Sequence, residues 1–202
     1  MYPILLDVTH RRIVIIGGGH VGLRKAVKLV EAGAQDVTVI SPKFADGFPD
    51  SVKKVTGVFR AEQLEGASLV FAATDLPDVN AAVVAEAARR GIWANRADEE
   101  GGDFTVGAVL REGLVTLGIW SESPALSAQI RDGVKQQWDT RWTAMAKAMQ
   151  TLRPMIVTAD LTAEKRRNLM RQLAGEAAME KLAAEGIDGL EKWVKEQIRD
   201  NG

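Results

Sequence analysis

The first half of the chain alternates short apolar runs with segments of helical periodicity. Residues 13–16 are four consecutive β-branched residues, a pattern typical of a strand buried on both faces of a parallel sheet. Apolar residues then recur at helical intervals over 21–30, and 37–40 is a second apolar run. A strand, a helix and a strand in this order predict a first β-α-β unit.

The alternation continues for three more strands. The predicted elements are a weak strand over 52–60, a buried strand over 69–73, a helix from Pro77 to Arg90 and a strand over 92–95. Asp75 is a candidate N-cap for the helix that begins at Pro77. Strands that alternate with helices predict the α/β class, with a Rossmann-like, doubly wound parallel sheet.

The pattern changes after residue 96. An acidic loop that contains glycine covers 97–103, and the next two apolar runs, 104–110 and 114–120, are separated by only three residues. Such a short gap predicts a hairpin. The rest is predicted to be helical, from Ser123-Pro124 to about 138, over 140–152 with an end enforced by Pro154, over 162–182 and over 190–199.

Composition narrows the function classes. The chain has 202 residues, of which 46% are hydrophobic and 26% charged, which is typical of a folded α/β protein with one core and a smaller appendage. A net charge of -1 gives no global argument for binding nucleic acid or an acidic membrane surface. The absence of cysteine excludes disulfides and thiolate chemistry. Because no signal-like or membrane-length apolar run is present, we expect a cytoplasmic protein.

The first predicted strand and helix are joined by a glycine-rich turn. Gly17, Gly19 and Gly22 have the G-x-G-x-x-G spacing. Glycine permits the tight turn and the close approach of backbone to a pyrophosphate, which the positive end of the following helix attracts. The favoured interpretation is a dinucleotide site, and the alternative is a tight turn required only for packing.

The end of the second predicted strand leaves the choice of dinucleotide open. An NAD site usually has an acidic residue there, whereas Asp36 precedes this strand and is expected at the opposite end of the sheet. Ser41 can bond a ribose hydroxyl, and Lys43 can reach a 2′-phosphate. The candidate cofactor contacts are Gly17, Gly19, His20, Val21, Gly22, Ser41, Pro42, Lys43, Thr74 and Asp75.

Several segments taken in order resemble one family. They are GGGHVGLRK at 17–25, EAGA at 31–34, AATD at 72–75, Val79-Asn80, Asn95 with Asp98, Asp103-Phe104, Ser123-Pro124-Ala125-Leu126 and Ile130-Arg131. Together they resemble the precorrin-2 dehydrogenase family, the NAD-dependent module of siroheme synthesis that also forms the N-terminal half of multifunctional siroheme synthases. The resemblance runs from about residue 2 to residue 134.

The resemblance implies a function and an organisation. It implies oxidation of precorrin-2, a small-molecule tetrapyrrole, to sirohydrochlorin with NAD as cofactor, and some relatives also insert ferrous iron. It further implies a homodimer with three segments: an NAD-binding domain over 1–110, a dimerisation segment over 111–145 and a C-terminal helical domain over 146–202. The alternatives are a bifunctional dehydrogenase and ferrochelatase, and, from another class, a regulatory module that senses NAD(H) without turnover.

The resemblance also suggests chemical roles. The aspartate implicated in the family maps to Asp98, our candidate base, for which a turn cap or a partner of a pyrrole N–H is the alternative. Weaker candidates for substrate contacts are Asn95, Arg96, Asp103 and Ser121. No metal site made by protein ligands alone is expected, because the only histidines are His10 and His20.

Two segments depart from the family pattern. The loop over 120–124 is shortened and lacks the usual glycines, which in the family would let the backbone approach a ligand. Arg96 stands where an apolar residue is usual. A cation at this position could pair with one of the eight carboxylates of precorrin-2.

Overall fold

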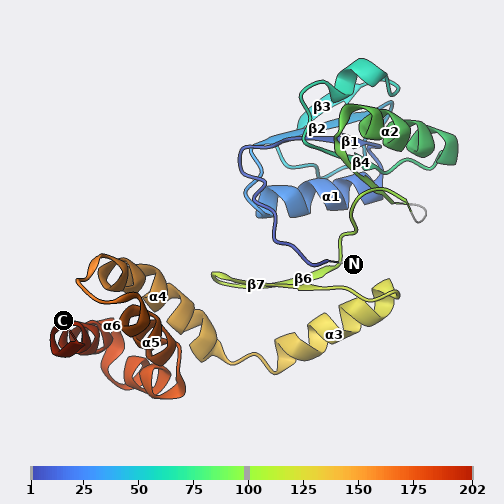
Figure 1. Cartoon of the computed structure of the whole chain (residues 1–202). Helices are drawn as coiled ribbons and strands as arrows, with labels where there is room; N and C mark the ends of the chain where they lie inside the picture. Colours follow the sequence, from blue (N-terminus) through green and yellow to red (C-terminus); the bar gives the residue numbers. More distant parts are fainter. Residues whose placement is uncertain (1, 98–100, 202) are drawn as a thin grey trace. The chain divides into compact units, whose positions relative to one another are not determined.

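The computed structural model describes residues 2–97 and 101–201. The chain forms two compact units, Met1–Val106 and Gly107–Gly202. Figure 1 colours the first from blue to green and the second from green to red. The finer division of the second unit at residue 145 remains a prediction.

A five-stranded parallel sheet organises the first unit, with the strand order β3-β2-β1-β4-β5. The strands are β1 (Arg12–Ile16), β2 (Asp36–Ser41), β3 (Lys53–Thr56), β4 (Leu69–Ala72) and β5 (Trp93–Arg96). The chain runs outward from β1 to β3 and then returns to β4, on the other side of β1. The predicted Rossmann-like, doubly wound sheet is therefore confirmed, and its topological switch point lies between β1 and β4.

Both faces of the sheet are covered. Ile13 and Ile15 of β1 pack in one core with Ala26 of α1 (His20–Glu31). On the other face, Val14 and Ile16 of β1 pack in a second core with Val83 of α2 (Pro77–Arg90). The short 3-10 helix η1 (Ala61–Leu64) contributes Leu64 to this second core. Because both faces of β1 are buried, its sequence is apolar at every position from Ile13 to Ile16. The same packing holds the carboxyl ends of the strands in place at one edge of the sheet.

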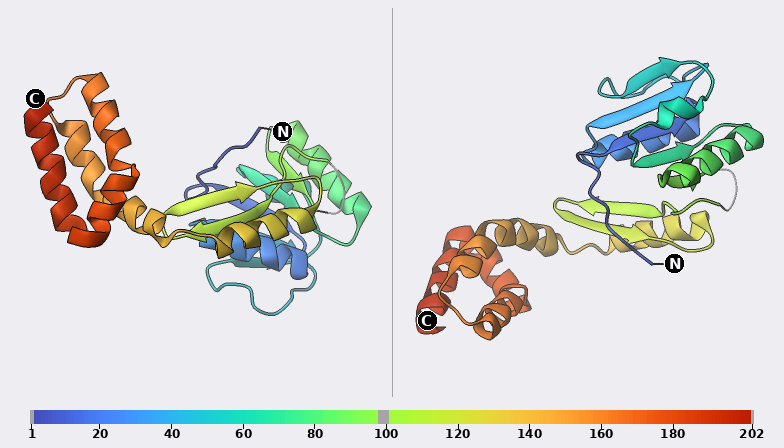
Figure 2. Two further views of the ribbon diagram at one scale, coloured as in Figure 1. Left: turned by 90° about the horizontal axis from the view of Figure 1, so that it is seen from below. Right: turned by 45° about the horizontal axis from the view of Figure 1, so that its top comes forward.

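The second unit begins with an antiparallel hairpin of β6 (Ala108–Glu112) and β7 (Val115–Ile119), followed by α3 (Pro124–Gln136). Figure 2 shows the hairpin alongside α3. Gly113 begins the two-residue turn with φ of +61°, which glycine adopts readily. The predicted hairpin is confirmed, but its first strand starts at Ala108 and not at residue 104, because Asp103 and Phe104 bond to β5 instead.

The second unit is completed by α4 (Thr140–Thr158), α5 (Ala163–Leu173) and α6 (Glu176–Asn201). The chain leaves helical geometry inside α6 at Gly186, where φ is 69°, so α6 consists of two helical segments. They share a core of their own. Pro154 was predicted to end α4, and this is wrong, because Leu152 and Ile156 on either side of it are fully buried and hold the helix together. The single helix predicted over 162–182 is also wrong, since the chain leaves helical geometry between Leu173 and Glu176.

In the part of the chain that the structure describes, we find no helix with the length and apolar character needed to span a membrane.

Candidate functional site

The glycine-rich turn lies at the carboxyl end of β1, at the switch point of the sheet. Its backbone is tied to both neighbouring strands, since the Gly17 N–H donates to the carbonyl oxygen of Ile40 at 2.9 Å and the Ala73 N–H donates to that of Ile16 at 2.8 Å. The Ala45 N–H donates to the carbonyl oxygen of Gly18 at 2.7 Å. The turn is therefore held in place before any ligand binds.

The four glycines of the turn do not have the same reason to be glycine. A Cβ on Gly17 would lie 2.2 Å from the carbonyl oxygen of Ala73, one on Gly18 would lie 2.5 Å from that of Lys43, and one on Gly22 would lie 1.9 Å from that of Gly17. Gly17 also has φ of +119°. Around Gly19, by contrast, no atom of the described residues, apart from its own chain neighbours, lies within 4 Å of the position of a Cβ. Packing explains three of the glycines, and only Gly19 borders open space.

These contacts give a stability prediction for Gly22. The Cβ of a Gly22→Ala variant would overlap backbone that a rotamer change cannot move, so we expect a loss of about 2 kcal/mol or more in the free energy of unfolding. Urea unfolding followed by circular dichroism measures this loss. A variant as stable as the wild type would show that the close helix–turn packing is absent in solution.

The N-terminus of α1 opens beside Gly19. Gly19 is the N-cap residue, so it supplies no side-chain cap, and the first turn of the helix carries no acidic residue. The first N–H groups of the helix are therefore free of side-chain competitors for an anion. His20 is exposed beside them, and Val21 is half-buried.

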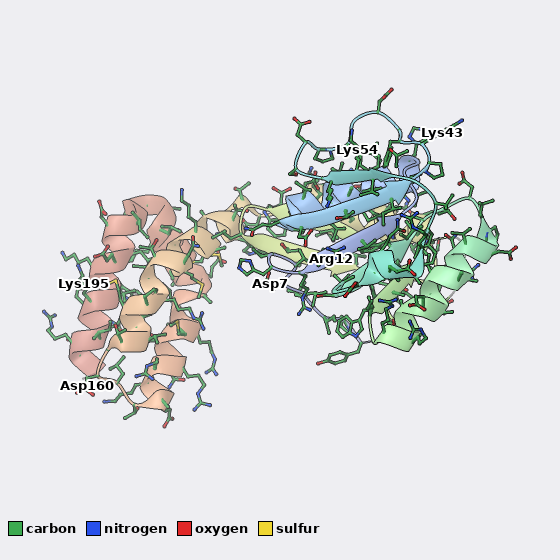
Figure 3. All side chains as sticks on the ribbon, turned by 90° about the horizontal axis from the view of Figure 1, so that it is seen from above. Asp7, Arg12, Lys43, Lys54, Asp160 and Lys195 are labelled. Carbon is green, nitrogen blue, oxygen red and sulfur yellow. The ribbon has the colours of Figure 1, made fainter. Side chains whose placement is uncertain are left out.

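The end of β2 presents Ser41, which is buried, with its Oγ 3.4 Å from the Lys43 backbone N. Pro42 and Lys43 follow in an exposed loop, and Figure 3 labels Lys43 there. Asp36 lies at the opposite end of β2, in register with Arg12. The hydroxyl of Ser41, and not a carboxylate, is thus the polar group at the carboxyl end of this strand.

Beyond β4, Thr74 and Asp75 occupy the other side of the turn. Asp75 is exposed, and its predicted role as N-cap of α2 is wrong, because Leu76 is the N-cap residue. The Leu76 N–H donates instead to Thr74 Oγ1 at 3.2 Å. Pro77 already fixes the first helical φ, so the helix starts without a carboxylate cap.

A fully buried asparagine, Asn80, holds this loop, a role that the sequence pattern containing Val79-Asn80 does not predict. Its Oδ1 accepts from the Thr74 N–H at 3.1 Å and lies 2.8 Å from Thr74 Oγ1, while its Nδ2 donates to the Thr74 carbonyl oxygen at 2.9 Å. Besides its place in the family pattern, the signal in the sequence is an amide in the first turn of a predicted helix, followed by apolar residues. Asn80 thereby fixes Thr74 at the edge of the sheet.

Of the candidate substrate residues near β5, Asn95 and Asp103 take part in hydrogen bonds that hold the local backbone. Asn95 is buried and bonds to Lys25 and to Phe104, and the Asp103 carboxylate accepts from the Ala94 N–H at 2.8 Å. These contacts give Asp103 a structural role beside any role with substrate. Arg96 is half-buried as a residue, and its Nη2 lies 3.4 Å from the Pro77 carbonyl oxygen. Asp98 lies outside the described residues.

Ser121 belongs to the second unit, near the start of α3. Its Oγ donates to the carbonyl oxygen of Ser123 at 2.7 Å and lies 2.8 Å from the Oγ of the buried Ser127. Ser123 is the N-cap residue of α3, with its Oγ accepting from the Leu126 N–H. Ser121 is thus part of a local hydroxyl network.

Over residues 2–97 and 101–201, no three His, Asp or Glu side chains gather in a way that could hold a metal ion.

Comparison with known proteins assigns the first unit to a protein family. A family model described as "Putative NAD(P)-binding" matches residues 4–108. The chain belongs to this NAD(P)-binding family. The matched residues contain the whole sheet, the glycine-rich turn and the loops after β2 and β4.

Relatives of this NAD(P)-binding chain include siroheme synthases. The siroheme synthase of Methylococcus capsulatus is 34% identical over 195 residues, which are 91% of this chain and 40% of the relative. That of Chromobacterium violaceum is 34% identical over 138 residues, 64% of this chain and 29% of the relative. The chain spans less than half the length of these curated relatives.

A solved structure of the precorrin-2 dehydrogenase SirC has the same fold. It superposes with a TM-score of 0.77 at 18% identity and covers 97% of this chain and 100% of that one. Together with the siroheme synthase matches, this confirms the resemblance to the precorrin-2 dehydrogenase family seen in the sequence.

Proposed function

We propose that this chain oxidises precorrin-2 to sirohydrochlorin with NAD as hydride acceptor. The observation that carries the proposal is the open space beside Gly19, at the switch point of the sheet. The chain that forms this sheet is similar in sequence to siroheme synthases. Open α/β sheets bind their ligands at this point, outside the carboxyl ends of the strands. A glycine with no packing reason there leaves room for a pyrophosphate.

The residues present fit a dinucleotide. Backbone N–H groups at the start of α1 would hold the pyrophosphate, with His20 and Val21 beside it. Ser41 would bond a ribose hydroxyl, with Pro42 and Lys43 along the edge of the adenosine, and Thr74 and Asp75 would border the other half. When bound, the dinucleotide supplies the hydride acceptor.

The protein's own chemistry concerns the substrate and one proton. Oxidation of precorrin-2 removes a hydride from carbon and a proton from a ring N–H or a neighbouring C–H, and the electron pair that the proton leaves behind becomes the new double bond of the conjugated ring system. We propose that the Asp98 carboxylate accepts that proton. Arg96 would pair with a substrate carboxylate, while Asn95 would hold the strand end beside it.

The test is anaerobic incubation of the purified chain with precorrin-2 and NAD, following sirohydrochlorin by its absorption spectrum. We expect formation that requires both protein and NAD, and parallel reactions with NADP and with no dinucleotide define the cofactor. Ferrous iron is then added, and loss of sirohydrochlorin faster than without protein would assign the bifunctional alternative. Tight binding of NAD with no turnover would overturn the dehydrogenase and favour the regulatory module.

We also infer a homodimer from apolar side chains that the second unit leaves exposed. Leu126 and Ile130, one turn apart on α3, are 47% and 43% exposed, and Trp120 before the helix is 47% exposed. Residues four apart share a helix face, so Leu126 and Ile130 form one exposed apolar surface on α3.

The dimer gives a prediction for the double variant Leu126→Asp/Ile130→Asp. Two carboxylates on this surface would have to be desolvated in a dimer, so we expect the variant to sediment as a monomer where the wild type sediments as a dimer. Gln129→Asp, an exposed change on the same helix, is the control and should remain dimeric. A monomeric wild type, or a double variant that stays dimeric, would contradict the inference.

A further inference from the structure

Lys25 of α1 lies against the sheet, and no carboxylate in the described part of the chain pairs with it. Lys25 Nζ donates to Asn95 Oδ1 at 2.7 Å and sits 5.2 Å from the ring centroid of Phe71. The neighbouring charges are Arg24 and Lys28 of its own helix, and β4 and β5 present Phe71 and Asn95 to it. No salt bridge of Lys25 occurs within residues 2–97 and 101–201. Lys25 is half-buried, and an ammonium taken partly out of water without a counter-ion is costly, so its hydrogen bond to Asn95 is important to both residues.

Lys25 determines how the Asn95 side chain is oriented. An ammonium has donors only, so the amide oxygen of Asn95 must face it. The amide nitrogen then points the other way and donates to the carbonyl oxygen of Phe104 at 2.9 Å. Because Asn95 is only 5% exposed, water cannot substitute freely for either contact.

Asn95 is the centre of a stem that we define as residues 94–95 paired with residues 102–104. The Asp103 N–H donates to the Ala94 carbonyl oxygen at 2.8 Å, the Ala94 N–H returns a bond to the Asp103 carboxylate, and Asn95 forms a bridge with Gly102. A Cβ on Gly102 would lie 2.5 Å from the Ala94 carbonyl oxygen. Phe104 packs edge-on against Phe71, under Lys25.

We propose that Lys25 is a positioning residue that holds this stem through Asn95. The stem fixes the described residues on both sides of Asp98, so Lys25 would act on the reaction without touching the substrate. This inference rests on the proposed function for its catalytic consequence, but the contact itself can be tested without any substrate.

The first test is hydrogen exchange of the stem amides in Lys25→Met. Methionine fills the same space but cannot donate, so we expect the Asp103 and Ala94 amides to exchange about tenfold faster or more, the equivalent of one lost hydrogen bond to a charged group. Lys28→Met, an exposed change one turn along α1, is the control and should leave them unchanged.

A second variant, Asn95→Asp, keeps the inference testable if Lys25→Met fails to fold. Aspartate still accepts from Lys25 but cannot donate to Phe104, so the stem amides should again exchange faster. Exchange equal to that of the wild type in the folded variants would overturn the inference.

The second test is the pH profile of hydride transfer. Burial, followed by the charges of Arg24 and Lys28, lowers the pKa of Lys25 to about 8. Below that pH the ammonium fixes the Asn95 amide, and above it the neutral amine can also accept, so the wild-type kcat should fall as pH rises through about 8. Lys25→Met should have a lower kcat, an unchanged KM for NAD and no such fall.

The two tests separate the possible failures. A wild type with no turnover overturns the proposed function, and the exchange of the stem amides still decides the role of Lys25. A variant with wild-type kcat and the same alkaline fall overturns the positioning role. A merely structural loss would reduce kcat and leave the alkaline fall in place.

Discussion

Replacing Asp98 by alanine is expected to slow hydride transfer by about 10²- to 10⁴-fold, the usual contribution of a general base. Without a carboxylate, the proton that leaves precorrin-2 must pass to water. Because the residue is proposed to act on the substrate, the dissociation constant of NAD should not change. Single-turnover absorbance measurements under anaerobic conditions give the rate, and fluorescence titration gives the affinity.

The neighbouring carboxylate provides a matched comparison for Asp98. Glu99→Gln removes a negative charge next to it in the sequence and should retain most of the activity, while Asp98→Asn should be as slow as Asp98→Ala. If Asp98→Asn retains wild-type activity, Asp98 does not take the proton, and a role in positioning a pyrrole N–H remains.

Replacing Gly19 by valine is expected to weaken NAD binding by about 10- to 100-fold, which corresponds to the loss of one or two hydrogen bonds between backbone and phosphate. The side chain would enter the open space where the proposed pyrophosphate approaches the turn. Isothermal titration with NAD measures the change.

The stability of the Gly19 variant distinguishes a lost binding site from a damaged fold. Since no described residue beyond its chain neighbours lies within 4 Å of its Cβ position, Gly19→Val should unfold at nearly the wild-type urea concentration, in contrast to Gly22→Ala. A valine variant that binds NAD normally would remove the main structural support for the site.

The fold of the first unit was predictable because its signals are local. The β-branched run of β1 reports a strand buried on both faces, and the glycine spacing marks the turn into α1. The ends of the elements were less predictable where contacts between distant residues decide them. Pro154 remains inside α4 because Leu152 and Ile156 are buried on both sides of it.

The candidate site was predictable in its backbone but not in its side-chain network. The glycines, Ser41 and Thr74 follow from strand ends, which parallel topology brings to one edge. The contact of Lys25 with Asn95 joins residues 70 positions apart, and no spacing in the sequence indicates it. Nor does the sequence distinguish Gly19, which borders open space, from glycines that packing requires.

The central claim is that a dinucleotide at the glycine-rich turn takes the hydride of precorrin-2. It is tested most directly by the stoichiometry of NADH and sirohydrochlorin in one anaerobic reaction, run in parallel with the wild type and Gly19→Val. We expect one NADH for each sirohydrochlorin with the wild type and a large loss of both with the variant at limiting NAD. Sirohydrochlorin formed without NADH, or NAD bound by the wild type and never reduced, would contradict the claim.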